Sequence, residues 1–134
     1  MSDSPIQFYC MGHHNLLGTH KNTFEFSRDD HLTVNGDCIL GVSATFTLPL
    51  LQPALSWKRA KIVLFCQGIS DFVEFDVNAE FCSNHELVIR KSSFLSDRTF
   101  GINTTKGAID ISRELIERLK NPDASLLVTI EKIF

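Results

Sequence analysis

The sequence predicts a mainly β protein, an antiparallel β-sandwich or jelly-roll-like barrel with one helix near the C-terminus. Short segments alternate apolar and polar residues, most clearly over 71–79, where apolar side chains recur at every second position from Val73. Turn-forming residues separate these segments, and a convincing helical spacing of apolar residues occurs at one place, 111–120. Because the strands are not interleaved with helices, a doubly wound parallel sheet is disfavoured.

The N-terminal half predicts strands over 5–11, 20–27 and 38–45. Segment 38–45 is apolar and β-branched, which is typical of a central strand buried on both faces. Strict alternation in 20–27 places His20 and Glu25 on opposite faces of its strand. A bulge or an early turn would be needed to bring these two side chains together.

The rest of the chain predicts a hairpin, single strands and the helix. Residues 60–66 and 71–79 have the alternation and the connecting turn of a β-hairpin. The total is about seven strands by this pattern. The other expected elements are short helical turns within 48–57, strands at 86–91 and 126–133, a brief pairing at 99–102, and the helix at 111–120, which Asn121-Pro122 ends.

Composition limits the classes of partner. A chain of 134 residues suits a single domain, 1–134, with one core. Its net charge of −3 disfavours nucleic acid as a partner and leaves only a local basic patch to bind phosphates. The apolar runs are too short for a membrane span, and the N-terminus has no secretory pattern. We therefore expect a cytoplasmic or nuclear protein whose four cysteines stay free.

Residues 12–44 hold most of the side chains that could do chemistry. His13, His20 and Glu25 are candidate metal ligands, and Asp37 and Cys38 could complete a set. Their spacing is loose, and neither H-x-H nor H-E-x-x-H occurs, so no metal or other cofactor is assigned.

Cys38 is a candidate nucleophile that His13 or His20 would activate, with Asp37 as a further catalytic candidate. The competing interpretation is a small, buried hydrophobic Cys38 that reacts slowly with alkylating reagents. Asp37 follows Asn-Gly and could equally serve only to bond nearby backbone groups in the turn.

A second group of polar residues lies in the C-terminal half. Arg90, Lys91 and Arg98 occur beside small hydroxyl residues, and such sets hold carboxylates or phosphates. The competing interpretation is a solvated strand end.

Several short motifs together resemble one family. They are Gly12-His13-x-Asn15, Thr19-His20-x-x-Thr23-x-Glu25, Gly36-Asp37-Cys38-Ile39-x-Gly41-Val42, Arg90-Lys91-Ser92, Arg98-Thr99 and Arg113-Glu114-Leu115. The chain resembles the domain of unknown function 371 family, whose members are mostly archaeal. The resemblance implies a jelly-roll-like β-sandwich with little helix and brings no established activity. Gly18 stands where a typical member has Ala, and Asn22 where it has Thr.

The leading hypothesis is a binding module for a small anionic ligand, a nucleotide or an acidic group of a protein partner. The alternatives are a hydrolase or isomerase with a His/Cys or metal-assisted site, and a subunit whose polar cluster only supports an assembly. The expected ligand-binding residues are His13, Asn15, Thr19, His20, Glu25, Asp37, Arg90, Lys91 and Arg98.

Overall fold

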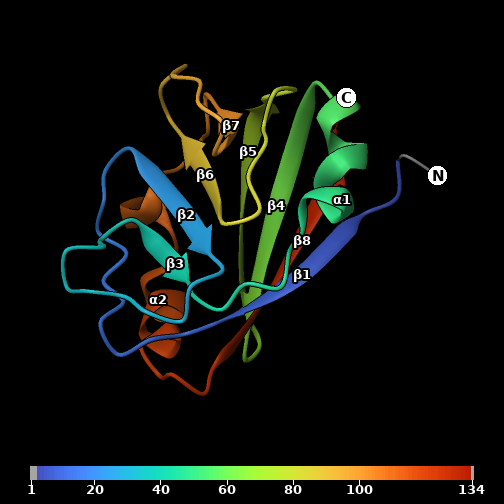
Figure 1. The fold of residues 1–134 in the computed structure, drawn as a ribbon. Coiled ribbons are helices and arrows are strands. Elements are labelled where there is room, and N and C mark those ends of the chain that lie inside the picture. Colours follow the sequence, from blue (N-terminus) through green and yellow to red (C-terminus); the bar gives the residue numbers. More distant parts are fainter. Residues whose placement is uncertain (1–2, 134) are drawn as a thin grey trace.

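A computed structural model describes residues 3–133, which fold mainly as strands (Figure 1). The strands are β1 (Ile6–Met11), β2 (Thr23–Ser27), β3 (Ile39–Gly41), β4 (Arg59–Cys66), β5 (Ile69–Val77), β6 (Glu86–Arg90), β7 (Thr99–Ile102) and β8 (Ser125–Lys132). The helices are α1 (Leu48–Leu51), α2 (Arg113–Leu119) and two 3₁₀ turns, η1 (Gln52–Ser56) and η2 (Ala108–Asp110). The prediction of a mainly β protein is confirmed.

All the strands of the described part belong to one mixed sheet. Their order is β1-β8-β4-β5-β7-β6-β2-β3, with the β4–β5 hairpin at the centre. Most pairs are antiparallel, but β2–β3 and β6–β7 are parallel. The finer prediction of an antiparallel β-sandwich or jelly-roll-like barrel is not confirmed, because the strands form one mixed sheet.

The two edges of the sheet meet just beyond β3. Met11, at the end of β1, exchanges backbone hydrogen bonds of 2.7 and 2.9 Å with Val42. Thr45 continues this contact, because its N–H donates to the Tyr9 carbonyl at 2.9 Å. Figure 1 shows β1 passing beneath the other strands toward β3. This contact ties the first strand to the segment that carries part of the cavity described below.

Two of the expected strands are shorter than predicted. Segment 38–45 forms a strand only over Ile39–Gly41, and Ser43 then takes a positive φ of 51°, which no strand residue adopts. The prediction of a central strand there is wrong, because β3 ends the strand order. Strand β2 begins at Thr23, three residues later than expected, and this leaves His20 in a preceding turn.

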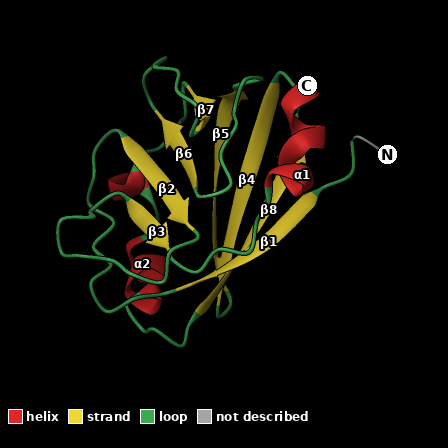
Figure 2. Ribbon diagram, viewed as in Figure 1, coloured by secondary structure: helices red, strands yellow, loops and turns green. Residues whose placement is uncertain are grey.

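The core lies under one face of the sheet and is rich in phenylalanine. Phe24 and Phe26 of β2 are fully buried, and Phe8 packs edge-on against Phe26 with ring centroids 5.5 Å apart. Helix α2 begins at a Ser112 cap and buries its apolar face on the core. Figure 2 shows how small the helical share is; no helix within 3–133 is long and apolar enough to cross a bilayer.

Candidate functional site

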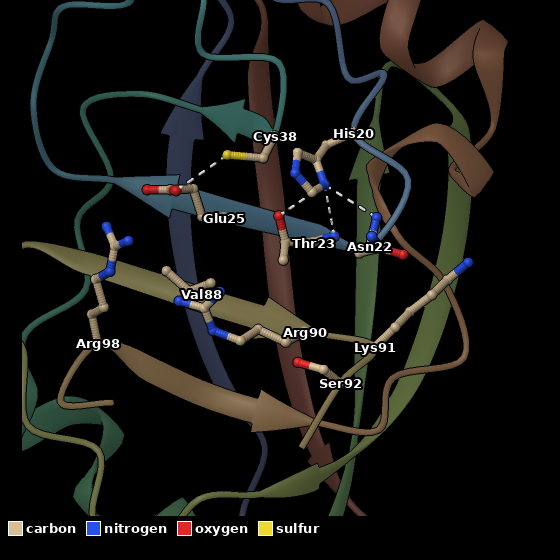
Figure 3. Close-up of a pocket in the computed structure, with 10 residues that line it drawn as sticks. All are labelled: His20, Asn22, Thr23, Glu25, Cys38, Val88, Arg90, Lys91, Ser92 and Arg98. Carbon is tan, nitrogen blue, oxygen red and sulfur yellow. Dashed lines mark hydrogen bonds between the residues drawn. The ribbon is translucent and has the colours of Figure 1, made fainter. Parts of the chain in front are cut away.

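An open cavity of about 710 Å³ lies on the outer face of the sheet, over β2 and β6. Figure 3 shows two rows of side chains, one from β2 and the residues that precede β2 and β3, the other from β6, the residues after it and the residue before β7. The lining residues are His20, Asn22, Thr23, Glu25, Cys38, Val88, Arg90, Lys91, Ser92 and Arg98.

Strand alternation explains why these side chains share a face. Thr23 pairs with Arg90, and Glu25 with Val88, across the antiparallel β2–β6 ladder. Their neighbours along each strand point to the opposite face and are fully buried, as Phe24 and other core residues show. The same pattern that builds the core therefore places a polar set over it.

His20 is held in one tautomer by the turn that follows it. Its Nδ1 accepts hydrogen bonds from the backbone N–H groups of Asn22 and Thr23, both at 3.1 Å. Because a backbone N–H can only donate, Nδ1 carries the lone pair and the ring proton of the neutral imidazole sits on Nε2. Figure 3 shows this second nitrogen on the side of the ring that faces Cys38. His20 thus presents an N–H donor to the cavity.

The turn that carries His20 is supported from behind. The His20 carbonyl accepts from Ile109 N–H at 3.0 Å, and the Asn22 carbonyl accepts from Lys91 N–H at 2.8 Å. Gly107 packs so closely on the turn that an added Cβ would clash with the Lys21 carbonyl. These contacts fix the early turn that brings His20 to the same side as Glu25.

Glu25 is a buried carboxyl, only 8% exposed. Its Oε1 accepts a hydrogen bond from Cys38 Sγ at 3.3 Å, and its side chain also hydrogen-bonds Glu86. Burial, followed by the bond to Glu86, raises its pKa to about 7. Glu25 therefore holds a proton over part of the neutral range and can give or take one there.

The Cys38 thiol lies on the cavity wall and is half-buried rather than packed in the core. Burial and the neighbouring Glu25 carboxylate raise its pKa to about 12. Only a thiolate attacks as a nucleophile, so the free protein keeps this group in its unreactive form. The described geometry gives Cys38 the role of a hydrogen-bond donor to Glu25.

Two of the three cations in the cavity are paired with carboxylates. Arg98 donates to Glu86 Oε2 at 2.7 Å, and Lys91 Nζ lies 2.9 Å from Asp110 Oδ2. Figure 3 places Arg98 at one end of the cavity and Lys91 at the other. The bond to Lys91 is also the main reason why the pKa of Asp110 is lowered.

Arg90 is different, because within residues 3–133 it forms no ion pair. Its Nε donates to Thr99 Oγ1 at 2.9 Å, and its Cζ lies 5.1 Å from the centroid of the Phe94 ring. Burial and the nearby Arg98 charge lower its pKa. The guanidinium is therefore fixed in direction and has no ion pair in this part of the chain, although the nearby Glu25 carboxyl acts on its pKa in the opposite sense.

The structure leaves His13 and Asn15 outside the cavity lining. His13 stacks on His14 with ring centroids 4.5 Å apart, and its Nδ1 accepts from Asn15 N–H at 3.0 Å. Burial lowers the His13 pKa, and the adjacent His14 and His31 rings lower it further. Asn15 donates from its side chain to the Leu32 carbonyl at 2.9 Å. Both residues thus have local partners in the loops.

Thr19 and Asp37 support the cavity through the backbone. The Asp37 carbonyl accepts from Thr19 N–H at 2.9 Å and from His20 N–H at 3.2 Å. The next carbonyl, that of Cys38, accepts from Glu25 N–H at 2.9 Å. This segment holds the His20 turn against β2 and β3, so Asp37 contributes its main chain where sequence analysis considered its carboxylate.

Four residues that line the cavity were not among the site residues predicted from the sequence. Two of them had a usable signal, since Thr23 and Val88 share a face with Glu25 and Arg90 by a period of two. The other two lie in the loops before β2 and after β6, where no period applies. The missed residues are Asn22, Thr23, Val88 and Ser92.

The candidate metal ligands do not form a metal cluster. In residues 3–133, no three or more His, Cys, Asp or Glu side chains converge so that they could hold an ion. His20 and Glu25 line the same cavity, whereas His13 does not. The donor set is therefore not that of a preformed metal centre.

Comparison with known proteins places this arrangement in a family. Residues 8–133 match the family described as "Domain of unknown function (DUF371)", a match that covers the cavity and nearly all of the sheet. The chain belongs to the DUF371 family. It is also similar to an uncharacterised protein, MJ0206, of the archaeon Methanocaldococcus jannaschii, with 34% identity over 116 residues, 81% of this chain and 86% of that protein.

Proposed function

We propose that this DUF371 protein is a binding module for a small anionic molecule, which it holds in the cavity over β2 and β6. The observation that carries the proposal is the Arg90 guanidinium, which lines the cavity and forms no ion pair within residues 3–133. A partly buried cation that no ion pair neutralises raises the free energy of the empty site, and Glu25, with a pKa of about 7, offsets the Arg90 charge only in part. An anion that binds to Arg90 would remove that cost.

The other donors suit the same ligand. His20 offers an N–H from Nε2, and Ser92 offers a hydroxyl on the same lining. Lys91 and Arg98 stand at the two ends of the cavity, each with a carboxylate that an incoming anion would compete with. Charge-assisted hydrogen bonds of this kind are about twice as strong as neutral ones.

The test compares Arg90 with an arginine whose charge is already compensated. Inorganic phosphate is titrated at low ionic strength into the wild type, Arg90→Gln and Arg59→Gln, and binding is followed by amide chemical shifts. Arg59 serves as the matched control because it bonds Asp76 at 2.8 Å on another part of the sheet. We expect Arg90→Gln to weaken phosphate binding about tenfold or more, and Arg59→Gln to leave it unchanged. Equal weakening in the two variants, or a wild type that does not bind phosphate, would contradict the proposal.

Glu25 supports a second candidate function, a hydrolase that acts on the bound anion. A carboxyl group with a pKa of about 7 can donate its proton to a leaving group near neutral pH. The high pKa of Cys38 does not support a thiolate nucleophile in that reaction. Release of nitrophenol from p-nitrophenyl phosphate, lost in Glu25→Gln while phosphate binding remains, would favour the hydrolase. Release that stays at the uncatalysed rate would leave the binding module as the function.

A further inference from the structure

An aromatic ring stands beside the unpaired cation of the cavity. The Phe94 ring centroid is 5.1 Å from Cζ of Arg90, and the Phe94 N–H donates to Ser92 Oγ at 3.3 Å. Arg90 and Ser92 both line the cavity. Phe94 is not itself one of the lining residues, but it contacts two of them from the loop that joins β6 to β7.

Phe94 exposes an unusually large share of its surface for a phenylalanine. It is 60% exposed, and the next residue, Leu95, is 53% exposed. One side of the ring is turned to the Arg90 guanidinium, so most of the exposed area lies away from that contact. An exposed aromatic ring next to a cationic cavity offers a flat face on which a planar ligand group can stack.

The direction of Arg90 is fixed by the strand next to it. Its Nε donates to Thr99 Oγ1, and Thr99 is fully buried and bonded in turn to Ser96 Oγ at 2.8 Å. Figure 3 shows the Arg90 side chain extending along β6 in the direction of Val88, which keeps it inside the cavity. The cation and the ring therefore form one preorganised pair rather than two independent surface groups.

We propose that the ligand of this cavity is a nucleoside 5′-monophosphate, with its phosphate on Arg90 and its base stacked on Phe94. This inference rests on the proposed anion-binding function and adds a chemical class to it. A phosphate monoester carries up to two charges and three terminal oxygens, which match the several separated donors better than the two oxygens of a carboxylate.

The Phe94 ring favours a nucleobase as the group that the bound phosphate carries. Bases stack on aromatic side chains, and every base has such a face, so Phe94 predicts little preference among the four bases. The cavity volume of about 710 Å³ lies within the range of small-molecule sites. A single nucleotide also suits a chain whose net charge of −3 gives no attraction to a long polyanion.

The experiment separates the base from the phosphate. Dissociation constants of AMP, ribose 5-phosphate and adenosine are measured by calorimetry for the wild type, Phe94→Ala and Phe72→Ala. Phe72 is the matched control, because it is 52% exposed and also lies near a cation, Lys61, at 5.5 Å. The wild type should bind AMP about tenfold or more tightly than ribose 5-phosphate. Phe94→Ala should remove that difference by weakening AMP alone, and Phe72→Ala should change neither ligand.

Three other results would each contradict a part of the proposal. Equal affinity for AMP and ribose 5-phosphate in the wild type would overturn the nucleotide assignment and leave anion binding intact. Adenosine binding as tight as AMP would overturn the placement of the phosphate on Arg90. If neither phosphate compound bound, the proposed function itself would fail and the nucleotide with it. Because Phe94 is exposed, Phe94→Ala should keep the wild-type circular dichroism spectrum, which is checked first.

Discussion

Two regions of the same sheet carry arginines and carboxyl groups on their outer faces, and they use them in opposite ways. On β4 and β5, Arg59 bonds Asp76 at 2.8 Å and lies 3.8 Å from Glu74. On β2 and β6, Arg90 has no ion pair within residues 3–133, while Glu25 beside it is buried against a second carboxyl. The charges of the first region are paired with one another, whereas Arg90 in the second has no such partner among the described residues.

The pKa values of the carboxyl groups differ between the two regions in the same way. A hydrogen bond from Asn103, together with Arg59, holds the pKa of Asp76 below its usual value. Burial and Glu86 instead raise the pKa of Glu25 to about 7. Hydrogen bonds and an opposite charge stabilise the ionised form of a carboxyl group, whereas burial beside another carboxyl stabilises the protonated form, and such raised pKa values are frequent at functional sites. The pairing of charges thus separates a structural surface from a candidate site.

The largest expected effect is on stability as a function of pH. Because folding raises the pKa of Glu25 from 4.5 to about 7, its contribution is fully present below pH 4.5 and is lost as the pH rises through 7. The shift corresponds to about 3 kcal/mol in the free energy of unfolding. Urea unfolding between pH 5 and 8 should show this decline in the wild type and a flatter profile in Glu25→Gln.

Asp76→Asn is the control from the other region, and its sign is opposite. The lowered pKa of Asp76 means that its contribution is present at neutral pH and is lost as the pH falls through the acidic range. Its profile between pH 5 and 8 should therefore keep the wild-type decline. A decline that persisted unchanged in Glu25→Gln would show that another group causes it.

The next effect concerns the reactivity of Cys38. With a pKa of about 12, its thiolate is scarce at pH 7.5, although the few thiolates present are more nucleophilic. We expect iodoacetamide to modify Cys38 about a hundredfold more slowly than a free thiol peptide. Cys82 is exposed and gives an internal reference in the same digest, read by mass spectrometry. If Cys38 were modified as fast as Cys82, this prediction would be wrong and Cys38 would again be a candidate nucleophile.

The smallest effect belongs to the paired surface. Arg59→Gln removes two contacts of an arginine whose side chain is 26% exposed, and exposed ion pairs contribute about 1 kcal/mol or less. Thermal unfolding should show a modest loss of stability that shrinks in high salt. A loss of several kcal/mol would mean that the β4–β5 surface depends on this arginine far more than its exposure indicates.

Much of the fold follows from local patterns. The alternation that predicted the hairpin is present as β4 and β5, and the helical spacing is present as α2. Segment 38–45 was predicted too long, since an apolar, β-branched run does not reveal the positive φ of 51° at Ser43. The parallel pairing of β2 with β3 depends on contacts between distant segments, which no periodicity encodes.

The sequence predicted the kinds of side chain at the candidate site better than it predicted which residues line it. His20, Arg90 and Arg98 do line one cavity, together with Glu25 and Cys38. The sequence could not show that His13 stacks on His14 and satisfies its Nδ1 locally. Nor could it show that Asp37 supports the site with its carbonyl, because residue type says nothing about which part of a residue makes the contact.

The pairing of β1 with β8 has a consequence for how the chain folds as it is made. Gln7 and Thr129, which hydrogen-bond across these strands, are 122 positions apart. At a synthesis rate of 5–20 residues per second, β1 would wait roughly 6–24 s for its partner strand. Until then β1 lacks this partner strand, although Phe26 and Phe46, which pack on Phe8, are made much earlier. The β1–β8 ladder therefore closes late in synthesis, and strand pairs so far apart in the chain are of the kind that slows folding.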